Sequence, residues 1–220
     1  MRVQAVAPRD RSWSRPFDIA LALGAILLLS PLFVFIAALI LVVDGRPVLF
    51  RQQRIGKSGK PFVIWKFRSM RGGTPGLSIT ALNDRRVTRV GAWLRTLKLD
   101  ELPQLVNVLQ GSMSFIGPRP EVPEYVVVDN DVWRKVLEVR PGITDLASLA
   151  FRDEEAILAS APDRDAYYRS VILPEKLRLN LRHQEARSFM RDLKLLWLTT
   201  RYSFFPFGFD RERIMKSLGF

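Results

Sequence analysis

The hydrophobic and polar positions divide the chain sharply near its start. Residues 19–43 form an apolar run of 25 residues without a charge, interrupted only by Gly24, Ser30 and Pro31. At ~1.5 Å per residue, a helix of this length would cross a hydrocarbon core ~30 Å thick. The run is too long for a cleaved signal peptide, and no small-residue cleavage site follows it. The pattern therefore predicts a membrane helix, with Asp18 placed to cap its start.

Two features bear on how this helix sits in the membrane. Pro31 removes a backbone donor near the middle of the run and predicts a kink or break, where Ser30 can bond to the freed backbone. Basic residues flank the run on both sides, and the positive-inside rule would place both flanks in the cytoplasm. A re-entrant helix broken at Ser30-Pro31 satisfies this rule at both ends. An ordinary kinked span is the alternative, because membrane helices tolerate proline.

Beyond the membrane run, the pattern changes to short segments. Apolar stretches bounded by turn residues indicate a β-hairpin, with strands at 48–50 and 62–65 around a basic loop, 54–61. Helical spacing of apolar residues predicts several helices, and in the first of them Val90, Trp93, Leu94 and Leu97 share one face that is expected in the core. Those helices cover residues 89–97, 101–110, 132–139 and the strongly basic stretch 176–202, which is typical of the membrane surface.

These elements predict an α+β protein that is mostly helical, with a short β-hairpin and interfacial helices. We divide the chain into four parts. They are a basic lead (1–14), the re-entrant membrane helix (15–45), a compact catalytic domain on the cytosolic face (46–203) and an aromatic C-terminal tail (204–220). The 175 residues after position 45 are enough for a compact core.

Charge and composition narrow the chemistry. The net charge of +12 fits nucleic acid, anionic lipid or phosphorylated ligands, and the membrane run favours the last two. The absence of cysteine excludes disulfides and thiolate nucleophiles. The one histidine, His183, lies in a polar run and is expected on a solvated helix face, which excludes a multi-histidine zinc site. Any metal should be bound by oxygen, which indicates magnesium.

Asp100 and Glu101 form a pair of carboxylates within a strongly basic part of the chain. Carboxylates surrounded by basic residues indicate a phosphate site, where the carboxylates hold a metal ion or attack phosphorus. The pair also has a purely structural interpretation: Asp100 as a helix N-cap, Glu101 as a first-turn charge and Gly111 as the helix end. The two interpretations are compatible, because a helix N-terminus attracts phosphate.

Four cations are candidates to hold phosphate beside this pair. Lys66 and Arg68 follow the second strand candidate, Arg95 precedes Asp100 by five residues, and Arg119 lies between two prolines that make its loop rigid. The glycine-rich residues 72–76 are the best candidate for a mobile lid. Glycines in the basic hairpin loop lack the spacing of a phosphate-binding P-loop, so that class is rejected.

A series of short segments along the chain forms a recognisable pattern. They are Arg15-Pro16-Phe17-Asp18, Ser30-Pro31, Gln53-Arg54-Ile55-Gly56, Lys66-Phe67-Arg68-Ser69-Met70, Asp84 to Thr88, Leu99 to Leu109, Gly111 to Ser114, Gly117 to Glu121 and Arg140 to Thr144. In this order they resemble the bacterial sugar transferases, or monotopic phosphoglycosyl transferases, over roughly Arg15 to Thr200. One departure is Asp145, where the family pattern has glycine after Pro-Gly-Ile-Thr.

The resemblance implies transfer of a phospho-sugar from a UDP-sugar to membrane polyprenyl (undecaprenyl) phosphate, with release of UMP and dependence on Mg²⁺. It implies a re-entrant helix in the bacterial inner membrane, a cytoplasmic catalytic domain and a role in starting cell-surface glycan assembly. Asp100 would be the nucleophile of a ping-pong reaction, and Glu101 would help to position metal or water, so both are candidate metal ligands. Lys66, Arg68, Arg95 and Arg119 would bind the substrate phosphates.

Three alternatives stay open at this point. The first is a membrane-anchored binder of nucleic acid or anionic lipid, which leaves the acid pair unexplained; we expect no nucleic-acid partner. The second is a degenerate family member acting as a scaffold, against which intact Asp100 and Glu101 argue. The third is direct transfer in a ternary complex, with the carboxylates acting only as metal ligands. The basic C-terminal helices also leave room for a homodimer.

Overall fold

The computed structural model describes residues 14–71, 80, 84–205 and 207–220. The fold is mostly helical, as expected, with two small two-stranded sheets. The lid candidate at 72–76 lies outside the described residues. The elements are α1 (Ser14–Val43), β1 (Leu49–Ile55), β2 (Pro61–Phe67), α2 (Arg89–Thr96), α3 (Gln104–Gln110), β3 (Ser114–Ile116), α4 (Asp131–Val136), β4 (Gly142–Thr144), α5 (Leu146–Ala150), α6 (Glu154–Ala159), α7 (Arg164–Tyr167), α8 (Leu173–Glu185), α9 (Phe189–Phe204) and α10 (Arg211–Leu218).

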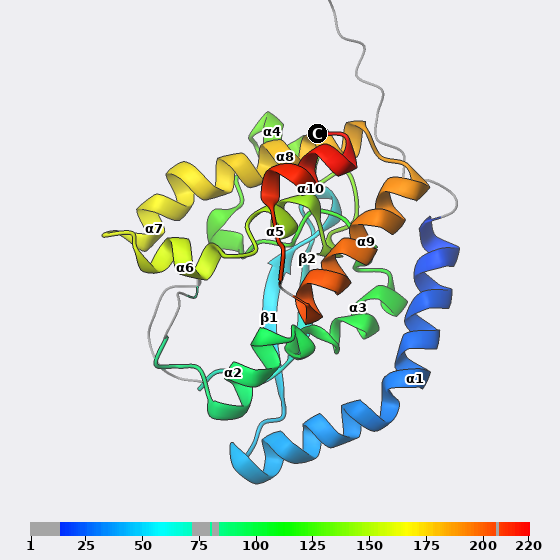
Figure 1. Cartoon of the computed structure of the whole chain (residues 1–220), viewed down its shortest axis with the longest axis vertical. Coiled ribbons are helices and arrows are strands. Elements are labelled where there is room, and N and C mark those ends of the chain that lie inside the picture. The colour runs from blue at the N-terminus through cyan, green and yellow to red at the C-terminus, as the bar shows by residue number, and fades with distance from the viewer. Residues whose placement is uncertain (1–13, 72–79, 81–83, 206) are drawn as a thin grey trace, which may run out of the picture.

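The apolar run forms one continuous helix, α1, that contains Pro31 and bends sharply in its course (Figure 1). The Ser30 hydroxyl donates to the carbonyl of Leu27 at 2.9 Å, which is the acceptor left without a donor by Pro31. The expected serine compensation is therefore confirmed, and the helix is bent rather than interrupted. By length and composition α1 is the one helix in the described part of the chain that could cross a membrane.

Both halves of α1 pack against the remainder of the protein. Arg15 donates to the carbonyls of Val108 and Leu109 at the C-terminal end of α3, and Asp18 accepts from the backbone N–H of Phe115 at 3.1 Å. The expectation that Asp18 caps the helix is wrong, because α1 already begins at Ser14. Figure 1 shows the first half beside α9 and the second half below α2, so the bend lets one helix follow two faces of the domain.

The β-hairpin is longer than predicted. Strands β1 and β2 are antiparallel and pair from Leu49↔Phe67 to Ile55↔Pro61, so they extend into the basic loop and leave only a tight turn. A second, parallel pair joins β3 to β4. A Cβ on Gly142 would lie 2.2 Å from the backbone nitrogen of Gly117, so this approach requires glycine.

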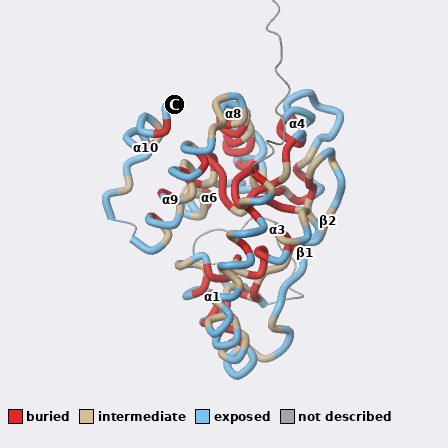
Figure 2. The backbone as a smooth tube through the Cα atoms, turned by 90° about the vertical axis from the view of Figure 1, so that its right-hand side faces the viewer, coloured by how far each residue is buried: buried red, intermediate tan, exposed pale blue. Residues whose placement is uncertain are grey.

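The main core lies between α3, the β3–β4 pair and the helices α5, α8, α9 and α10, where Figure 2 shows the buried residues concentrated. Two expectations about side chains are wrong. Trp93 is 42% exposed, although Val90 and Leu94 on the same helix are buried as predicted. His183 is buried rather than solvated, because α9 packs over it and places Asp192 3.2 Å from its ring nitrogen.

Asn107 on α3 joins the hairpin to the helical core. Its side-chain amide donates to the carbonyl of Val63 at 2.8 Å and accepts from the N–H of Trp65 at 3.1 Å, so it pairs with the open edge of β2. Asn107 is itself 1% exposed. This link fixes the position of Lys66, the next residue along β2, relative to the segment before α3.

We predict that Asn107→Ala destabilises the protein by about 2–3 kcal/mol, because two backbone groups of β2 lose their partners in a buried place. The measurement is chemical or thermal unfolding of the purified protein in detergent. Gln110→Ala, an exposed change on the same helix, serves as the control and should have almost no effect. Equal stability of the two variants would show that Asn107 does not hold the hairpin.

Candidate active site

The acid pair lies in a short 3₁₀ turn, Leu99–Glu101, between α2 and α3. Lys98 enters this turn in the left-handed conformation, with φ of 57°, and so reverses the chain direction after α2. Both carboxylates are buried. The N-cap interpretation of Asp100 is wrong, since α3 begins only at Gln104, whereas Gly111 closes α3 in the left-handed conformation as expected.

Cations occupy both oxygens of the Glu101 carboxylate. Lys66 Nζ lies 2.9 Å from Oε1, and Arg119 donates to both oxygens, with Nη1 at 3.2 Å from Oε2. Burial would raise the pKa of Glu101, but Arg119 and Lys66 outweigh it and hold the pKa well below its usual range. Glu101 is therefore a permanent anion that aligns two cations.

Asp100 has the opposite environment. Within the described part of the chain its carboxylate makes no hydrogen bond or close ion pair, although it is 4% exposed. Burial raises the pKa of Asp100, Lys66 lowers it, Glu101 raises it, and Arg95 and Lys98 lower it further; the net shift is upward. Asp100 is thus a poorly solvated carboxylate with oxygens available for chemistry, beside a neighbour whose charge is compensated.

Arg119 is held by the backbone as well as by Glu101. Its own N–H donates to Asp145 Oδ2 at 2.9 Å, and the other oxygen of Asp145 accepts from the N–H of Ser148 at the start of α5. The departure from the family pattern at Asp145 therefore has a structural explanation, as a helix cap that also anchors the arginine loop. Arg54 donates to the carbonyl of Pro120 at 3.1 Å on the other side of that loop.

The four predicted cations are not equivalent. Lys66 and Arg119 meet at Glu101, as described above. Arg95 pairs with Glu155 on α6, and its positive charge also lowers the pKa of Asp100. Arg68 instead donates to the carbonyls of Asp44, Gly45 and Arg46 at 2.6–2.7 Å, closing the segment after α1.

Sequence reasoning passed over Asp145, Arg54 and Lys98 as parts of this site. For Asp145 a signal existed, because aspartate is a preferred N-cap residue and Asp145 stands directly before the short apolar stretch that forms α5. The positions of Arg54 and Lys98 depend on strand pairing and on a left-handed turn. Neither of these has a clear local signature in the chain.

The donor set limits how a metal ion could bind. Among the described residues there is no group of three or more acidic or histidine side chains that could hold one. The oxygens of Glu101 already face Lys66 and Arg119, which leaves the Asp100 carboxylate as the available protein oxygen. Mg²⁺ commonly takes one or two carboxylates and fills its shell with water and substrate phosphate. One available carboxylate is compatible with a magnesium ion that takes its other ligands from water or phosphate oxygens.

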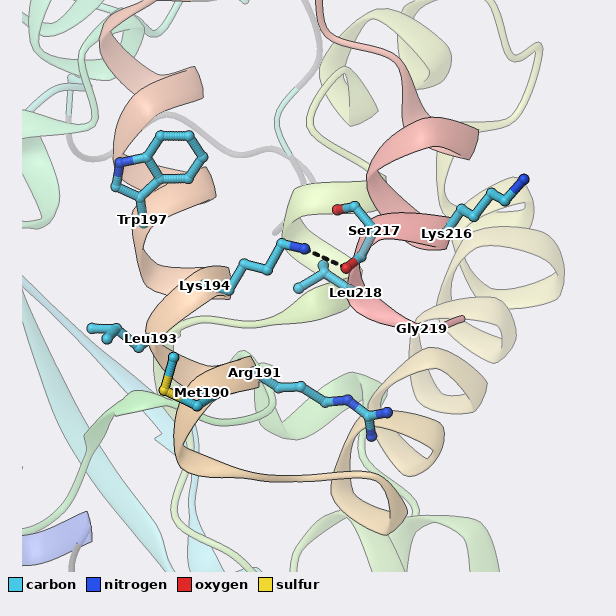
Figure 3. Close-up of a pocket in the computed structure, with 9 residues that line it drawn as sticks. All are labelled: Met190, Arg191, Leu193, Lys194, Trp197, Lys216, Ser217, Leu218 and Gly219. Atoms are coloured by element: carbon cyan, nitrogen blue, oxygen red, sulfur yellow. Dashed lines mark hydrogen bonds between the residues drawn. The ribbon is translucent and has the colours of Figure 1, made fainter.

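A surface groove lies away from the acid pair. A groove of about 750 Å³ runs between α9 and α10, and Figure 3 shows Met190, Leu193 and Trp197 along α9 and Lys194 reaching the carbonyl of Ser217. The groove is open and largely apolar. It contains no carboxylate, so it offers none of the groups that the acid pair supplies.

Comparisons with known proteins show the family to which the chain belongs. The model of the family described as bacterial sugar transferase matches residues 9–206, so the chain belongs to that family. It is 36% identical over 200 residues to the UDP-glucose:undecaprenyl-phosphate glucose-1-phosphate transferase of Escherichia coli (strain K12), covering 86% of this chain but 40% of that protein.

Two further relatives show the range of the family. The uncharacterized sugar transferase EpsL of Bacillus subtilis (strain 168) is 33% identical over 187 residues, covering 85% of each chain. The UDP-N-acetylgalactosamine-undecaprenyl-phosphate N-acetylgalactosaminephosphotransferase of Aeromonas hydrophila is 44% identical over 142 residues, covering 61% of this chain and 33% of that protein. The relatives' names thus include two different sugars.

We predict opposite stability effects for the two carboxylates at neutral pH. Glu101 has a lowered pKa, so its charge stabilises the fold above the unfolded pKa, and this contribution is lost as pH falls through the folded pKa. Asp100 has a raised pKa, so its ionisation costs stability once pH rises above the unfolded value. Glu101→Gln should therefore lower the melting temperature, with a loss of about 3–5 kcal/mol for a broken buried pair. Asp100→Asn should leave it unchanged or raise it.

Thermal unfolding of both variants in the same detergent tests this contrast. A large loss of stability in Asp100→Asn, comparable with that of Glu101→Gln, would contradict the different environments assigned to the two carboxylates. Repeating the scans at progressively lower pH should narrow the difference in stability between the wild type and Asp100→Asn, because protonation of Asp100 removes the charge whose burial is unfavourable.

Proposed function

We propose that this protein transfers a sugar 1-phosphate from a UDP-sugar to a polyprenyl phosphate in the membrane, releases UMP and so starts the assembly of a cell-surface glycan. The observation that carries the proposal is the contrast at the acid pair. Asp100 is a buried carboxylate without a bonded partner in the described structure, next to a glutamate that aligns Lys66 and Arg119. The relatives' printed activities support the choice of donor and acceptor.

The reaction proceeds in two displacements. An oxygen of Asp100 attacks the sugar-bearing phosphorus, the bond from that phosphorus to the bridging oxygen breaks, and UMP leaves with the electron pair. An aspartyl phospho-sugar remains on the protein. A phosphate oxygen of the polyprenyl phosphate then attacks the same phosphorus and displaces Asp100 as a free carboxylate, which gives ping-pong kinetics.

The surrounding residues serve this chemistry through charge. A carboxylate that approaches a diphosphate meets like charge, and the weakly solvated Asp100 depends on Lys66, Arg95 and Arg119 to compensate it. Arg119 sits in a loop held by Asp145 and Pro120, so its guanidinium is positioned before substrate binds. We retain Arg68 as a weaker candidate for phosphate, since it already holds three carbonyls.

A magnesium ion would be held on the protein side by Asp100, because Glu101, the other ligand expected from the sequence, already has both oxygens paired with Lys66 and Arg119. Bound there, it would withdraw negative charge from the phosphate oxygens. Attack by Asp100 and withdrawal of charge by Lys66 and Arg119 are the parts that this chain itself provides. A labelling experiment with the donor sugar distinguishes this two-step mechanism from direct transfer in a ternary complex.

The same proposal places the protein on the cytoplasmic face of the inner membrane, with α1 re-entrant. The bend of α1 supports this placement, as do the basic flanks on both sides of the apolar run. Helix α9 supports it as well. Its outer face exposes Met190, Leu193 and Trp197, while the opposite face is buried in the core, so the predicted interfacial helix is amphipathic.

The first prediction from this proposal concerns turnover. Purified protein in nanodiscs with Mg²⁺ and undecaprenyl phosphate should release UMP from at least one member of a panel of UDP-sugars, and Asp100→Asn should reduce the rate at least about 10³-fold. With the donor labelled in its sugar and no acceptor present, the label should stay on the wild-type protein and be absent from Asp100→Asn.

Each other outcome has a distinct meaning. Turnover without any protein-bound label, or turnover retained in Asp100→Asn, would contradict the covalent intermediate and favour direct transfer. No UMP release with any sugar, from protein shown to be folded and inserted in lipid, would contradict the enzyme and favour the scaffold.

The second prediction concerns topology, and the absence of native cysteine makes it simple to test. The single variant Ser12→Cys places a thiol before α1 in the sequence, and Lys60→Cys places one after it. If α1 is re-entrant, a membrane-impermeant maleimide labels both in inside-out vesicles and neither in intact spheroplasts. Labelling of the two positions from opposite sides would show that α1 spans the membrane.

A further inference from the structure

Arg95 lies on a helix that packs against the acid pair, and it forms an ion pair with a residue of another helix. Helix α2 contacts the turn Leu99–Glu101, and its Leu94 shares a hydrophobic cluster with Leu99 of that turn. The Arg95 guanidinium pairs with Glu155 at the start of α6. Figure 1 shows α2, which carries Arg95, and α6 on the same side of the protein. One arginine therefore connects the acid pair to an acidic residue 60 positions further along the chain.

The Arg95–Glu155 pair differs from the other ion pair at this site. Glu101 holds Arg119 through both carboxylate oxygens in a buried place, whereas Arg95 donates to Glu155 through one nitrogen to one oxygen. The Glu155 side chain is 43% exposed. A partly exposed pair with a single hydrogen bond contributes little stability and exchanges readily.

The neighbour of Glu155 shows that the fold does not depend on this residue to hold α6. Glu154 Oε2 lies 2.6 Å from Nζ of the buried Lys176 on α8, which ties the first turn of α6 to the core. Leu158, on the same helix, is fully buried. Glu155 is therefore available for a role other than packing.

We propose that Glu155 competes with the donor diphosphate for Arg95 and so sets the affinity of the protein for its nucleotide-sugar. This inference rests on the proposed function, in which Arg95 is a phosphate ligand. A diphosphate carries more negative charge than one carboxylate and can bind a guanidinium through two oxygens, so it displaces Glu155 when it enters. Glu155 acts through Arg95 and is not itself a catalytic residue.

The competition has a direct consequence for substitutions. Glu155→Gln removes the competing charge and leaves Arg95 free for phosphate, so donor binding should tighten by about two- to fivefold, the range that a partly exposed ion pair is worth. The gain should shrink at high salt, because salt screens an exposed pair. If Glu155 instead held Arg95 in place for the substrate, the same change would weaken binding.

The experiment measures binding without turnover. The Asp100→Asn protein in nanodiscs is titrated calorimetrically with UDP and with the UDP-sugar that supports turnover in the wild type, at low and high salt. Glu155→Gln is then added to this background, and separately combined with Arg95→Gln. We expect tighter binding from Glu155→Gln alone and no gain when Arg95 is also replaced.

Asp153→Asn is the matched control, because it removes the same charge two residues away. The Asp153 side chain makes no cap bond to α6, and its carboxylate lies 3.9 Å from Arg152 Nε. An equal gain in donor affinity from Asp153→Asn would show that removing any nearby negative charge tightens binding, and would overturn the specific role of the Arg95–Glu155 pair. Unchanged or weaker binding in Glu155→Gln, from protein with an unaltered melting temperature, would overturn the competition itself. Failure of the Asp100→Asn protein to bind any UDP-sugar would contradict the proposed function instead.

Discussion

The site depends on the compensation of Glu101 by two cations from distant parts of the chain. Lys66 comes from a β-strand and Arg119 from a loop between two prolines, and both reach a carboxylate in a buried turn. An unpaired carboxylate would be costly there. Because Glu101 satisfies these cations, Asp100 beside it stays without a bonded partner in the described structure and keeps its oxygens available. One residue of the pair thus organises the charge, and the other is available for chemistry.

The rest of the fold holds these three side chains in fixed positions relative to one another. Asn107 fastens the hairpin edge to α3 and so places Lys66, while Asp145 and Arg54 hold the loop of Arg119 from two sides. Helix α1 is connected to the same framework, because Arg15 binds the end of α3 and Asp18 binds the backbone at β3. Under the proposed function, this connection would fix the depth of the acid pair relative to the bilayer that holds α1.

Some expectations failed for a common physical reason. His183 lies in a polar run and is nevertheless buried, because a later helix packs over it with Asp192. Trp93 follows the apolar spacing of its helix and is nevertheless half exposed. Asp18 was assigned to a cap, yet it bonds to a strand 97 residues away. The local sequence pattern indicates which face of a helix or strand is apolar and which is polar. Which segment packs against each face depends on residues far away in the sequence.

The sequence by itself determined the apolar helix with its proline bend, the mostly helical domain, the family and the identity of the acid pair. These follow from hydrophobic length, spacing and contiguous motifs, which are local properties. Only the tertiary structure decided that Glu101 is neutralised by Lys66 and Arg119, that Asp100 is left without a bonded partner in the described structure, and that Arg95 pairs with Glu155. Those contacts join residues 18 to 60 positions apart, and their pKa shifts depend on burial, which no linear pattern measures.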